Sequence, residues 1–513
     1  MNISDWIAKW ADFTPRKTAI RFEGKEISYG ELSANIARLA AGLKNRLGVA
    51  PGDRIAHLGY NSPEMLILLF ACARLGAMLA PLNWRLAAPE HRYILRQSGA
   101  RCLFADRSFQ GHVAALNEDG RDIALICVDA AAPDAGWTDF ATLARESAHD
   151  TPVNVISDNS PLLIVYTSGT TGKPKGAVLT QNALLWNAIN SMLAHDLRSS
   201  DHILTTLPMF HVGGLNILTT PALHAGATVT LHRKFDAAAT LREIAKSRPT
   251  LTVMVPAQMQ AASSHPEWGE TDLKSLRMLT TGSSIVPKPV IAPWHDRGIP
   301  VVQVYGSTET APIAIHQRAD DAMTTAGSTG KPAVHCEVRL IDKQGNDVAT
   351  GQCGEILVRG RNVMVEYWGD REATAEALRG GWHYTGDIGY RDEDGNYHVV
   401  DRKKDMIVSG GENIYPAELE AVLYEHPDIA EAAVVGRADR NWGEVAVAVI
   451  GLRAGRRLAK PEVLALFDDR LARFKHPKDV IFVKKLPRNA MGKILKFKTR
   501  QMLTGRGKDK CHS

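Results

Sequence analysis

Strand-like and helix-like segments alternate along this chain to about residue 310, and that alternation limits its fold more than any other feature. Ser28 and Glu31 are spaced as a capping box, and the apolar residues after them recur at helical spacing. A strand is predicted over residues 54–58 and a helix over residues 63–75. Residues from about 130 to 160 are rich in Ala, Asp, Asn and Pro and are predicted to form a connecting region. The pattern predicts an α/β protein with parallel sheets.

The pattern changes in the C-terminal part of the chain. From Val338 onwards, short strands separated by glycine-rich turns predict a β-rich, barrel-like subdomain. The charged segment 401–405 follows, and a helix start at Pro416 opens a compact α+β unit. We therefore expect a large N-terminal domain over residues 1–402 and a small, mobile domain over residues 403–513.

Composition excludes several classes of protein. The chain has 513 residues, of which 45% are hydrophobic and 23% are charged, so it can bury a large core without covalent staples. Its six cysteines form no CxxC pair, which argues against a zinc site or a disulfide framework and favours a reducing compartment. The most apolar stretch, residues 65–82, is interrupted by Arg74 and is too short to span a bilayer. We expect a cytoplasmic protein with no transmembrane segment.

The charge balance adds a weaker constraint. A net charge of +5 is too small to indicate a nucleic-acid partner. Residues 403–513 contain 22 Lys and Arg against 14 Asp and Glu. This basic C-terminal part suits contact with a polyanion, and a solvated basic face explains it equally well.

The segment from Tyr166 to Gly176, with the sequence YTSGTTGKPKG, carries the strongest chemical signal. It follows a buried strand predicted over residues 162–166. Its glycines let backbone N–H groups close around phosphate oxygens, its hydroxyls add donors, and its lysines add charge. It is not a Walker motif, because Thr167 and Pro174 occupy positions where that motif needs Gly and Ser or Thr. The segment is therefore predicted to bind phosphate.

This segment resembles the phosphate loop of the adenylate-forming enzymes, the superfamily of acyl-CoA synthetases, peptide-synthetase adenylation domains and beetle luciferases. The resemblance extends from about residue 10 to residue 500, and it is closest to bacterial fatty-acyl and feruloyl-type CoA synthetases. Further strings match in the family's order: Pro208–Gly213, Thr280–Ser284, Tyr305–Thr310, Tyr384–Asp387, Asp401–Glu420 and Pro487–Lys493.

The resemblance implies an ATP site in the N-terminal domain. Tyr305 would stack on the adenine, Asp387 would bond both ribose hydroxyls, and Arg402, just past a strand, would contact the ribose or the α-phosphate. Glu309 would bind Mg²⁺ as a hard oxygen ligand, together with the Thr167 hydroxyl. The remaining implied ATP-binding residues are Ser168, Gly169, Thr170, Thr171, Gly172, Lys175, Gly282, Ser283, Gly306 and Thr308.

The resemblance also assigns roles in the C-terminal domain. Lys493 would be the catalytic lysine that reaches the substrate carboxylate and the α-phosphate when this domain closes. Lys404 would be the hinge about which the domain rotates. Gly410 and Gly411 would line the pantetheine tunnel of coenzyme A.

The segment around His211 bears on the carboxylic acid substrate. No second histidine lies at metal-ligand spacing, so a zinc site is not indicated. The family resemblance makes His211 a residue that gates the acyl site and the approach of CoA, while Gly213 and Gly214 would leave room for the acyl group. No acidic residue follows His211 to meet a substrate ammonium group, which favours a carboxylate other than an amino acid.

The sequence thus predicts a ligase that uses ATP, Mg²⁺ and CoA to convert a carboxylic acid into an acyl-adenylate and then an acyl-CoA thioester. The acid would be a fatty acid or an aromatic, hydroxycinnamate-like acid. Two alternatives stay open: a freestanding adenylation enzyme that loads a carrier protein, and a non-catalytic nucleotide- or carboxylate-binding protein. A homodimer is compatible with the sequence.

Overall fold

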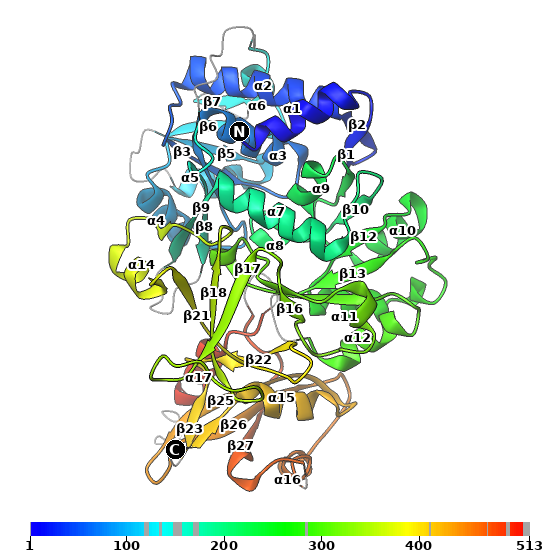
Figure 1. Ribbon diagram of the computed structural model, residues 1–513, viewed down its shortest axis with the longest axis vertical. Coiled ribbons are helices and arrows are strands. Elements are labelled where there is room, and N and C mark those ends of the chain that lie inside the picture. The colour runs from blue at the N-terminus through cyan, green and yellow to red at the C-terminus, as the bar shows by residue number, and fades with distance from the viewer. Residues whose placement is uncertain are drawn as a thin grey trace.

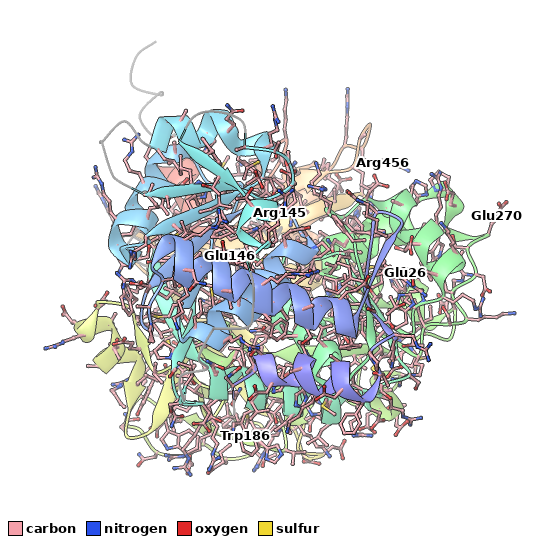
Figure 2. All side chains as sticks on the ribbon, turned by 90° about the horizontal axis from the view of Figure 1, so that it is seen from above. Glu26, Arg145, Glu146, Trp186, Glu270 and Arg456 are labelled. Carbon is pink, nitrogen blue, oxygen red and sulfur yellow. The ribbon has the colours of Figure 1, made fainter. Side chains whose placement is uncertain are left out.

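The computed structural model describes residues 2–505 apart from 117–122, 133–135, 147–155, 168–173, 283–285, 410–411, 469 and 489–492. Figure 1 shows a broad upper body that contains the N-terminus and a smaller unit below it, in orange and red. Exposed charged side chains such as Glu26, Glu270 and Arg456 lie on the outside of the molecule (Figure 2).

A large sheet forms one side of the upper body. Its neighbouring strands from β8 to β7 run parallel, and β9 and β19 join antiparallel at one edge. In spatial order the strands are β19 (Glu366–Tyr367), β9 (Lys175–Thr180), β8 (Pro161–Thr167), β4 (Met78–Pro81), β3 (Arg54–Leu58), β5 (Cys102–Ala105), β6 (Ala124–Cys127) and β7 (Trp137–Asp139). The helices within this part of the chain are α2 (Tyr29–Leu47), α3 (Pro63–Leu75), α4 (Ala88–Ser98), α5 (Gln110–Leu116) and α6 (Phe140–Leu143).

A second large sheet stands beside the first. Its central strands, from β14 to β1, are also parallel. In spatial order the strands are β16 (Lys331–Pro332), β15 (Ile315–His316), β14 (Val301–Tyr305), β13 (Met278–Thr281), β12 (Leu251–Val253), β10 (His202–Thr205), β11 (Thr228–Leu231), β1 (Thr18–Phe22) and β2 (Lys25–Ser28). Its helices are α1 (Ser4–Phe13), α7 (Gln181–His195), α8 (Val212–Asn216), α9 (Thr219–His224), α10 (Ala237–Ser247), α11 (Pro256–Ser263), α12 (Lys288–His295) and α13 (Ala319–Ala322).

Local signals explain where the helices begin and end. Ser28 and Glu31 form the predicted capping box at the start of α2, and Gly48 ends that helix with a φ of 61°. Helix α3 begins with Ser62 as its N-cap and Pro63 in its first turn. Almost every α3 side chain is buried, and one hydrophobic cluster joins this helix to residues of both sheets. A helix that is apolar all round is therefore buried, in contact with α1, α2, β4 and β8.

Two smaller parts complete the chain. An antiparallel, half-barrel sheet contains β17 (Cys336–Ile341), β18 (Gly354–Gly360), β21 (Trp382–Arg391), β20 (Leu378–Arg379) and β22 (Tyr397–Arg402), with α14 (Arg371–Ala377) beside it. The lower unit contains β24 (Glu412–Ile414), β23 (Ile407–Ser409), β26 (Gly443–Leu452), β25 (Ile429–Asp439) and β27 (Asp479–Phe482), with α15 (Pro416–Tyr424), α16 (Lys460–Ala465) and α17 (Lys496–Gly505). This lower unit has its own hydrophobic cluster, which includes Leu419, Val434 and Phe467.

The predicted fold class is confirmed: parallel α/β sheets, a β-rich subdomain and a small α+β unit. Two details differ from the prediction. The region of about 130–160 is not only a connection, because β7 and α6 lie within it and extend the first sheet. Arg402 is the last residue of β22 rather than a residue beyond a strand. Among the described residues, none of the helices combines the length and apolarity that a membrane crossing requires.

Candidate active site

Three predicted site residues from separate strands meet where the second sheet faces the half-barrel sheet. The hydroxyl of Tyr305, at the end of β14, donates a hydrogen bond of 2.9 Å to Oδ2 of Asp387. Nε of Arg402 lies 3.0 Å from Oδ1 of the same carboxylate, because Asp387 on β21 and Arg402 on β22 are register partners. The charge of Asp387 raises the pKa of Arg402 despite burial. The prediction that these three residues share a site is consistent with this geometry.

Glu309 lies in a single turn of 3-10 helix, Thr308–Thr310, and only 9% of it is exposed. Burial alone would raise its pKa, but nearby His383 and the hydroxyls of Tyr367 and Ser307 outweigh burial, so the pKa is lowered. Glu309 is therefore held as a carboxylate, the form that binds Mg²⁺.

Tyr367 on β19 is a site residue that the sequence did not indicate. Its hydroxyl donates a hydrogen bond of 2.7 Å to Oε1 of Glu309. Its ring lies 5.4 Å from Nζ of Lys175, which begins β9 at the end of the predicted phosphate loop. Tyr367 and Ala177 of β9 are register partners, so the sheet itself sets the position of the ring. No motif in a single sequence marks this tyrosine, because the contact joins residues 58 positions apart.

Lys493 belongs to the lower unit but lies within electrostatic reach of the Asp387–Arg402 pair. Burial lowers the pKa of Lys493, the charge of Arg402 lowers it further, and the charges of Asp387 and Asp405 oppose the shift. The structure therefore brings together Lys493 and Asp387, which are more than a hundred residues apart in the sequence. Lys404, the predicted hinge, lies in an exposed turn directly after β22.

Some buried polar atoms on β13 and β14 have no hydrogen-bond partner among the described residues, including Oγ1 of Thr281, the last residue of β13, and Nε2 of Gln303, the middle residue of β14. The two residues are register partners on adjacent parallel strands, two positions before the Tyr305 end of β14. Buried polar groups in folded proteins normally have partners. This edge is also where open α/β sheets bind ligands. Together with the Asp387 carboxylate and Glu309, these atoms fit a nucleotide with its magnesium ion.

The predicted glycines and loop residues divide into three groups. A Cβ on Gly306 would lie 1.6 Å from the carbonyl oxygen of Pro312, and one on Gly282 would lie 2.6 Å from that of Val304, so packing requires glycine at both positions. Thr167 ends β8 as the register partner of Lys175 on β9, so these two residues set where the predicted phosphate loop begins and ends. The other predicted residues of this kind lie outside the described residues: Ser168, Gly169, Thr170, Thr171, Gly172, Ser283, Gly410 and Gly411.

His211 directly precedes α8 and is half-buried, with its Nε2 atom fully buried. Burial and the charge of Arg85 lower its pKa to about 4, so the imidazole is neutral near pH 7. Its ring centroid lies 4.5 Å from that of Phe210. Asn61 fixes this segment, because its Oδ1 accepts a hydrogen bond of 2.8 Å from the backbone of Met209. His211 is therefore suited to shape an entrance rather than to carry charge.

A patch of aromatic and cationic side chains adjoins His211, and no sequence motif indicates it. Arg85 lies 4.2 Å from the ring centroid of Trp84, and Lys234 lies 4.7 Å from that of Tyr60. The rings of Tyr60 and Trp84 are 4.9 Å apart, and Trp84 is 6.5 Å from Phe210. Arg85 and Lys234 are exposed. Their charges and the ring faces can bind an anionic, aromatic ligand.

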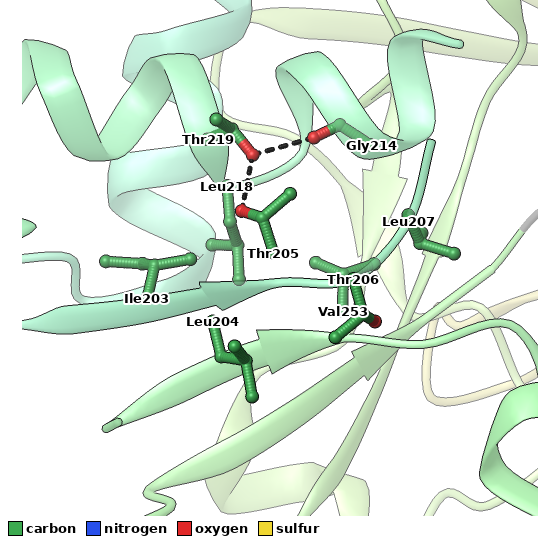
Figure 3. A pocket seen from close by; sticks show the side chains of 9 residues that line it. All are labelled: Ile203, Leu204, Thr205, Thr206, Leu207, Gly214, Leu218, Thr219 and Val253. Atoms are coloured by element: carbon green, nitrogen blue, oxygen red, sulfur yellow. Dashed lines mark hydrogen bonds between the residues drawn. The ribbon is translucent and has the colours of Figure 1, made fainter. Parts of the chain in front are cut away.

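A cavity between β10 and helices α8 and α9 is too small to hold a carboxylic acid substrate. Its volume of about 10 Å³ is near the minimum for one water molecule. Figure 3 shows the hydroxyl of Thr219 bonded to the carbonyl of Gly214 at 2.7 Å and to Thr205 at 2.8 Å. A Cβ on Gly214 would lie 2.3 Å from the carbonyl oxygen of Pro208. The expectation that this glycine leaves room for an acyl group is therefore wrong, because backbone packs against it.

Comparisons with known proteins identify the family. The family model described as AMP-binding enzyme matches residues 7–368, and that described as AMP-binding enzyme C-terminal domain matches residues 418–493. The chain is 53% identical over 504 residues to an indoleacetate–CoA ligase of Aromatoleum aromaticum, with 98% of each chain covered. It is 44% identical over 501 residues to a feruloyl-CoA synthase of Amycolatopsis sp, with 98% of this chain and 99% of the relative covered.

A solved structure of the o-succinylbenzoate CoA synthetase from Bacillus subtilis with ATP and magnesium ion has a TM-score of 0.84 and 32% identity, covering 96% of this chain and 98% of that one. The same synthetase with its acyl-adenylate intermediate has a TM-score of 0.86, with 96% and 97% covered. These likenesses confirm the resemblance to adenylate-forming enzymes. The chain belongs to the AMP-binding enzyme family and is an AMP-forming acid–thiol ligase.

Proposed function

We propose that this protein is an aromatic carboxylate–CoA ligase that uses ATP and Mg²⁺ to form an acyl-adenylate and then transfers the acyl group to CoA. One observation carries the proposal: Lys493 of the lower unit lies within electrostatic reach of the Asp387–Arg402 pair of the upper body. A protein that only bound nucleotide would have no use for a lysine brought across from another unit. This arrangement disfavours the non-catalytic alternative.

In the first step, a carboxylate oxygen of the acid attacks the α-phosphorus of ATP, and the bond to the β-phosphate breaks to release pyrophosphate. Asp387 would hold the ribose hydroxyls and Arg402 the α-phosphate region. The charge of Lys493 would offset the negative charge that gathers at the phosphorus. Mg²⁺, held by Glu309 and the Thr167 hydroxyl, would supply further charge neutralisation. Most of the rate enhancement would come from positioning and charge.

In the second step, the CoA thiol loses its proton to solvent and its sulfur attacks the acyl carbon, and AMP leaves. We propose that residues 403–513 form a lid that rotates about Lys404 between the steps, so that Lys493 leaves and Gly410 and Gly411 arrive. Neutral His211 would shape the passage of the thiol. The phosphate loop, including Ser168, Gly169, Thr170, Thr171, Gly172 and Lys175, would hold the phosphates in the first step.

The patch around Trp84 favours CoA over a carrier protein as the acceptor. A carrier protein presents only its phosphopantetheine arm, whereas free CoA also brings an adenine and several phosphates. Arg85 and Lys234 could meet phosphates, and the rings of Trp84 and Tyr60 could meet the base. Alanine at Arg85 should therefore raise the KM for CoA more than the KM for ATP, by about tenfold for one lost charge-assisted contact.

The names of the relatives support an aromatic acid as substrate. We propose an arylacetate such as indole-3-acetate, with a hydroxycinnamate such as ferulate as the second candidate. A fatty acid remains the third candidate, as expected from the sequence.

The test is pyrophosphate release with ATP and Mg²⁺, with and without CoA, across indole-3-acetate, ferulate, 2-succinylbenzoate, benzoate and palmitate. A CoA-dependent response that is strongest for an aromatic acid supports the proposal. A response confined to palmitate would overturn the substrate class. Turnover that requires a carrier protein in place of CoA would overturn the acceptor.

A further inference from the structure

A buried charge cluster lies where the lower unit meets β22. Oδ2 of Asp401 is 3.2 Å from Nζ of Lys496 and accepts a hydrogen bond of 3.0 Å from the backbone N–H of Ala417. Nζ of Lys496 is also 3.0 Å from Oε1 of Glu420. The side chains of Asp401, Lys496 and Glu420 are only 5%, 14% and 16% exposed. A buried charge that loses its partner is costly, so this cluster constrains the structure around it.

The cluster spans the boundary between the two proposed domains. Asp401 is a register partner of Ile388 on β21, so it belongs to the half-barrel sheet. Ala417 and Glu420 lie on α15, and Lys496 begins α17, so these three belong to the lower unit. Both partners of Oδ2 of Asp401 therefore lie across the boundary, whereas Oδ1 accepts a hydrogen bond of 2.7 Å from the backbone N–H of Arg402 on its own strand. The Lys496–Glu420 contact does not cross it.

A separate ion pair fixes α17 on the lower unit's side. Arg500 of α17 lies 3.0 Å from Oδ1 of Asp405, which follows the proposed hinge. Helix α17 also contacts β25 of the lower unit. If Asp401 released its partners, α17 would stay attached to the lower unit. The contacts of Asp401 could therefore break without unfolding that unit.

We propose that Asp401 is a positioning residue that holds the lower unit in the place where Lys493 reaches the Asp387–Arg402 pair. Lys496 is only three residues from Lys493 on the same segment, so the ion pair to Asp401 fixes the segment that carries the catalytic lysine. This inference rests on the proposed two-step function. The second step needs Lys493 to leave, so the strength of the Asp401 contacts sets the balance between the two steps.

Asp401→Asn tests the proposal, because asparagine keeps the shape and one acceptor oxygen for the backbone N–H groups of Ala417 and Arg402 but removes the charge that Lys496 meets. Asp479→Asn is the matched control: Asp479 pairs with Arg437 at 3.0 Å and Lys460 at 2.8 Å, wholly within the lower unit. Each variant of the full chain is assayed for adenylation, as single-turnover pyrophosphate release with indole-3-acetate. It is then assayed for thioester formation from supplied indoleacetyl adenylate and CoA.

Asp401→Asn should lower the adenylation rate about tenfold relative to the thioester rate. The variant weakens only the position of the lower unit that adenylation needs, so the loss is limited to the difference in free energy between the two positions of that unit. Asp401→Glu should restore part of the loss, and Asp479→Asn should leave the ratio unchanged. Equal loss of both half-reactions, or an unchanged ratio, would overturn the proposal.

A readout that needs no activity separates this inference from the proposed function. Limited trypsin digestion should cut the exposed turn at Lys403 and Lys404 faster in Asp401→Asn than in the wild type or in Asp479→Asn. If the wild type adenylates no acid, the proposed function fails while this comparison still decides the inference. An unchanged cleavage rate in Asp401→Asn would then count against it.

Discussion

The contact between Tyr367 and Glu309 offers the sharpest test of the proposed magnesium site. Tyr367→Phe removes one hydroxyl and keeps the ring. The ring contact with Lys175 and the pairing of β19 with β9 should therefore survive the change. What is lost is the hydrogen bond of 2.7 Å to the Glu309 carboxylate.

The size of the effect follows from the charge of the acceptor. A hydrogen bond to a charged group contributes about 1.5–3 kcal/mol. The lower end applies if water replaces the hydroxyl in part, and 1.4 kcal/mol corresponds to about a tenfold change in an equilibrium constant. Glu309 would also lose one of the groups that lower its pKa, so protons would compete better with Mg²⁺. We therefore expect the Mg²⁺ concentration for half-maximal adenylation to rise about tenfold.

The assay is pyrophosphate release at saturating ATP and acid over a range of Mg²⁺ concentrations. Tyr397→Phe is a matched control, because its hydroxyl contacts the carbonyl of Val338 at 3.4 Å and the side chain of Arg391, and not Glu309. The acid limb of the Tyr367→Phe pH profile should also move to higher pH. An unchanged Mg²⁺ dependence, with a loss that saturating Mg²⁺ does not repair, would refute the role given to Glu309 and Tyr367.

Four further outcomes can be measured. Lys493→Ala should lower adenylation by about 100-fold or more, as loss of one charge-stabilising donor does, while thioester formation from supplied acyl-adenylate persists; equal losses would contradict its role. Lys404→Pro should instead slow thioester formation more than adenylation, and an unchanged second step would remove the hinge assignment. Gly306→Ala should lower the melting temperature by several degrees, since its Cβ would overlap the Pro312 carbonyl; an unchanged melting temperature would show that the turn can relax. Burial lowers the pKa of His57 and His195 to about 4, so these two histidines take up protons between about pH 6.5 and 4 only in the unfolded chain. The free energy of unfolding should therefore fall over that range as pH drops, and a flat profile would contradict it.

Helix boundaries in this protein were predictable where they depend on neighbouring residues. The capping box of Ser28 and Glu31 and the proline at position 63 each determine a boundary within one turn. The exception is the edge of the first sheet, where β7 and α6 occupy a polar stretch that looked like a connection. Edge strands are often short, and their apolar pattern is weak because only one side pairs with a neighbour.

The same distinction between local sequence signals and tertiary contacts applies to the candidate site. Tyr305, Glu309, Asp387 and Lys493 could be proposed because they lie in strings that resemble a known family. Tyr367 could not, because it is recognised only by the carboxylate that its hydroxyl meets across the fold. The role proposed for Arg85 likewise depends on the aromatic rings that the tertiary structure places around it.

The charged segment at 401–405 shows the limit most clearly. In the sequence it is a run of like and unlike charges, and such runs usually lie on a solvated surface. In the structure two of its members differ in burial: Lys404 is exposed, whereas Asp401 is buried against Lys496, 95 residues away. Burial of a charge is tolerable only with a partner, so the position of the lower unit and the burial of Asp401 depend on each other. A sequence pattern records neither partner nor burial. Sequence reasoning therefore places Asp401 only at the boundary between the domains. It does not indicate the control over the two steps that we propose for this residue.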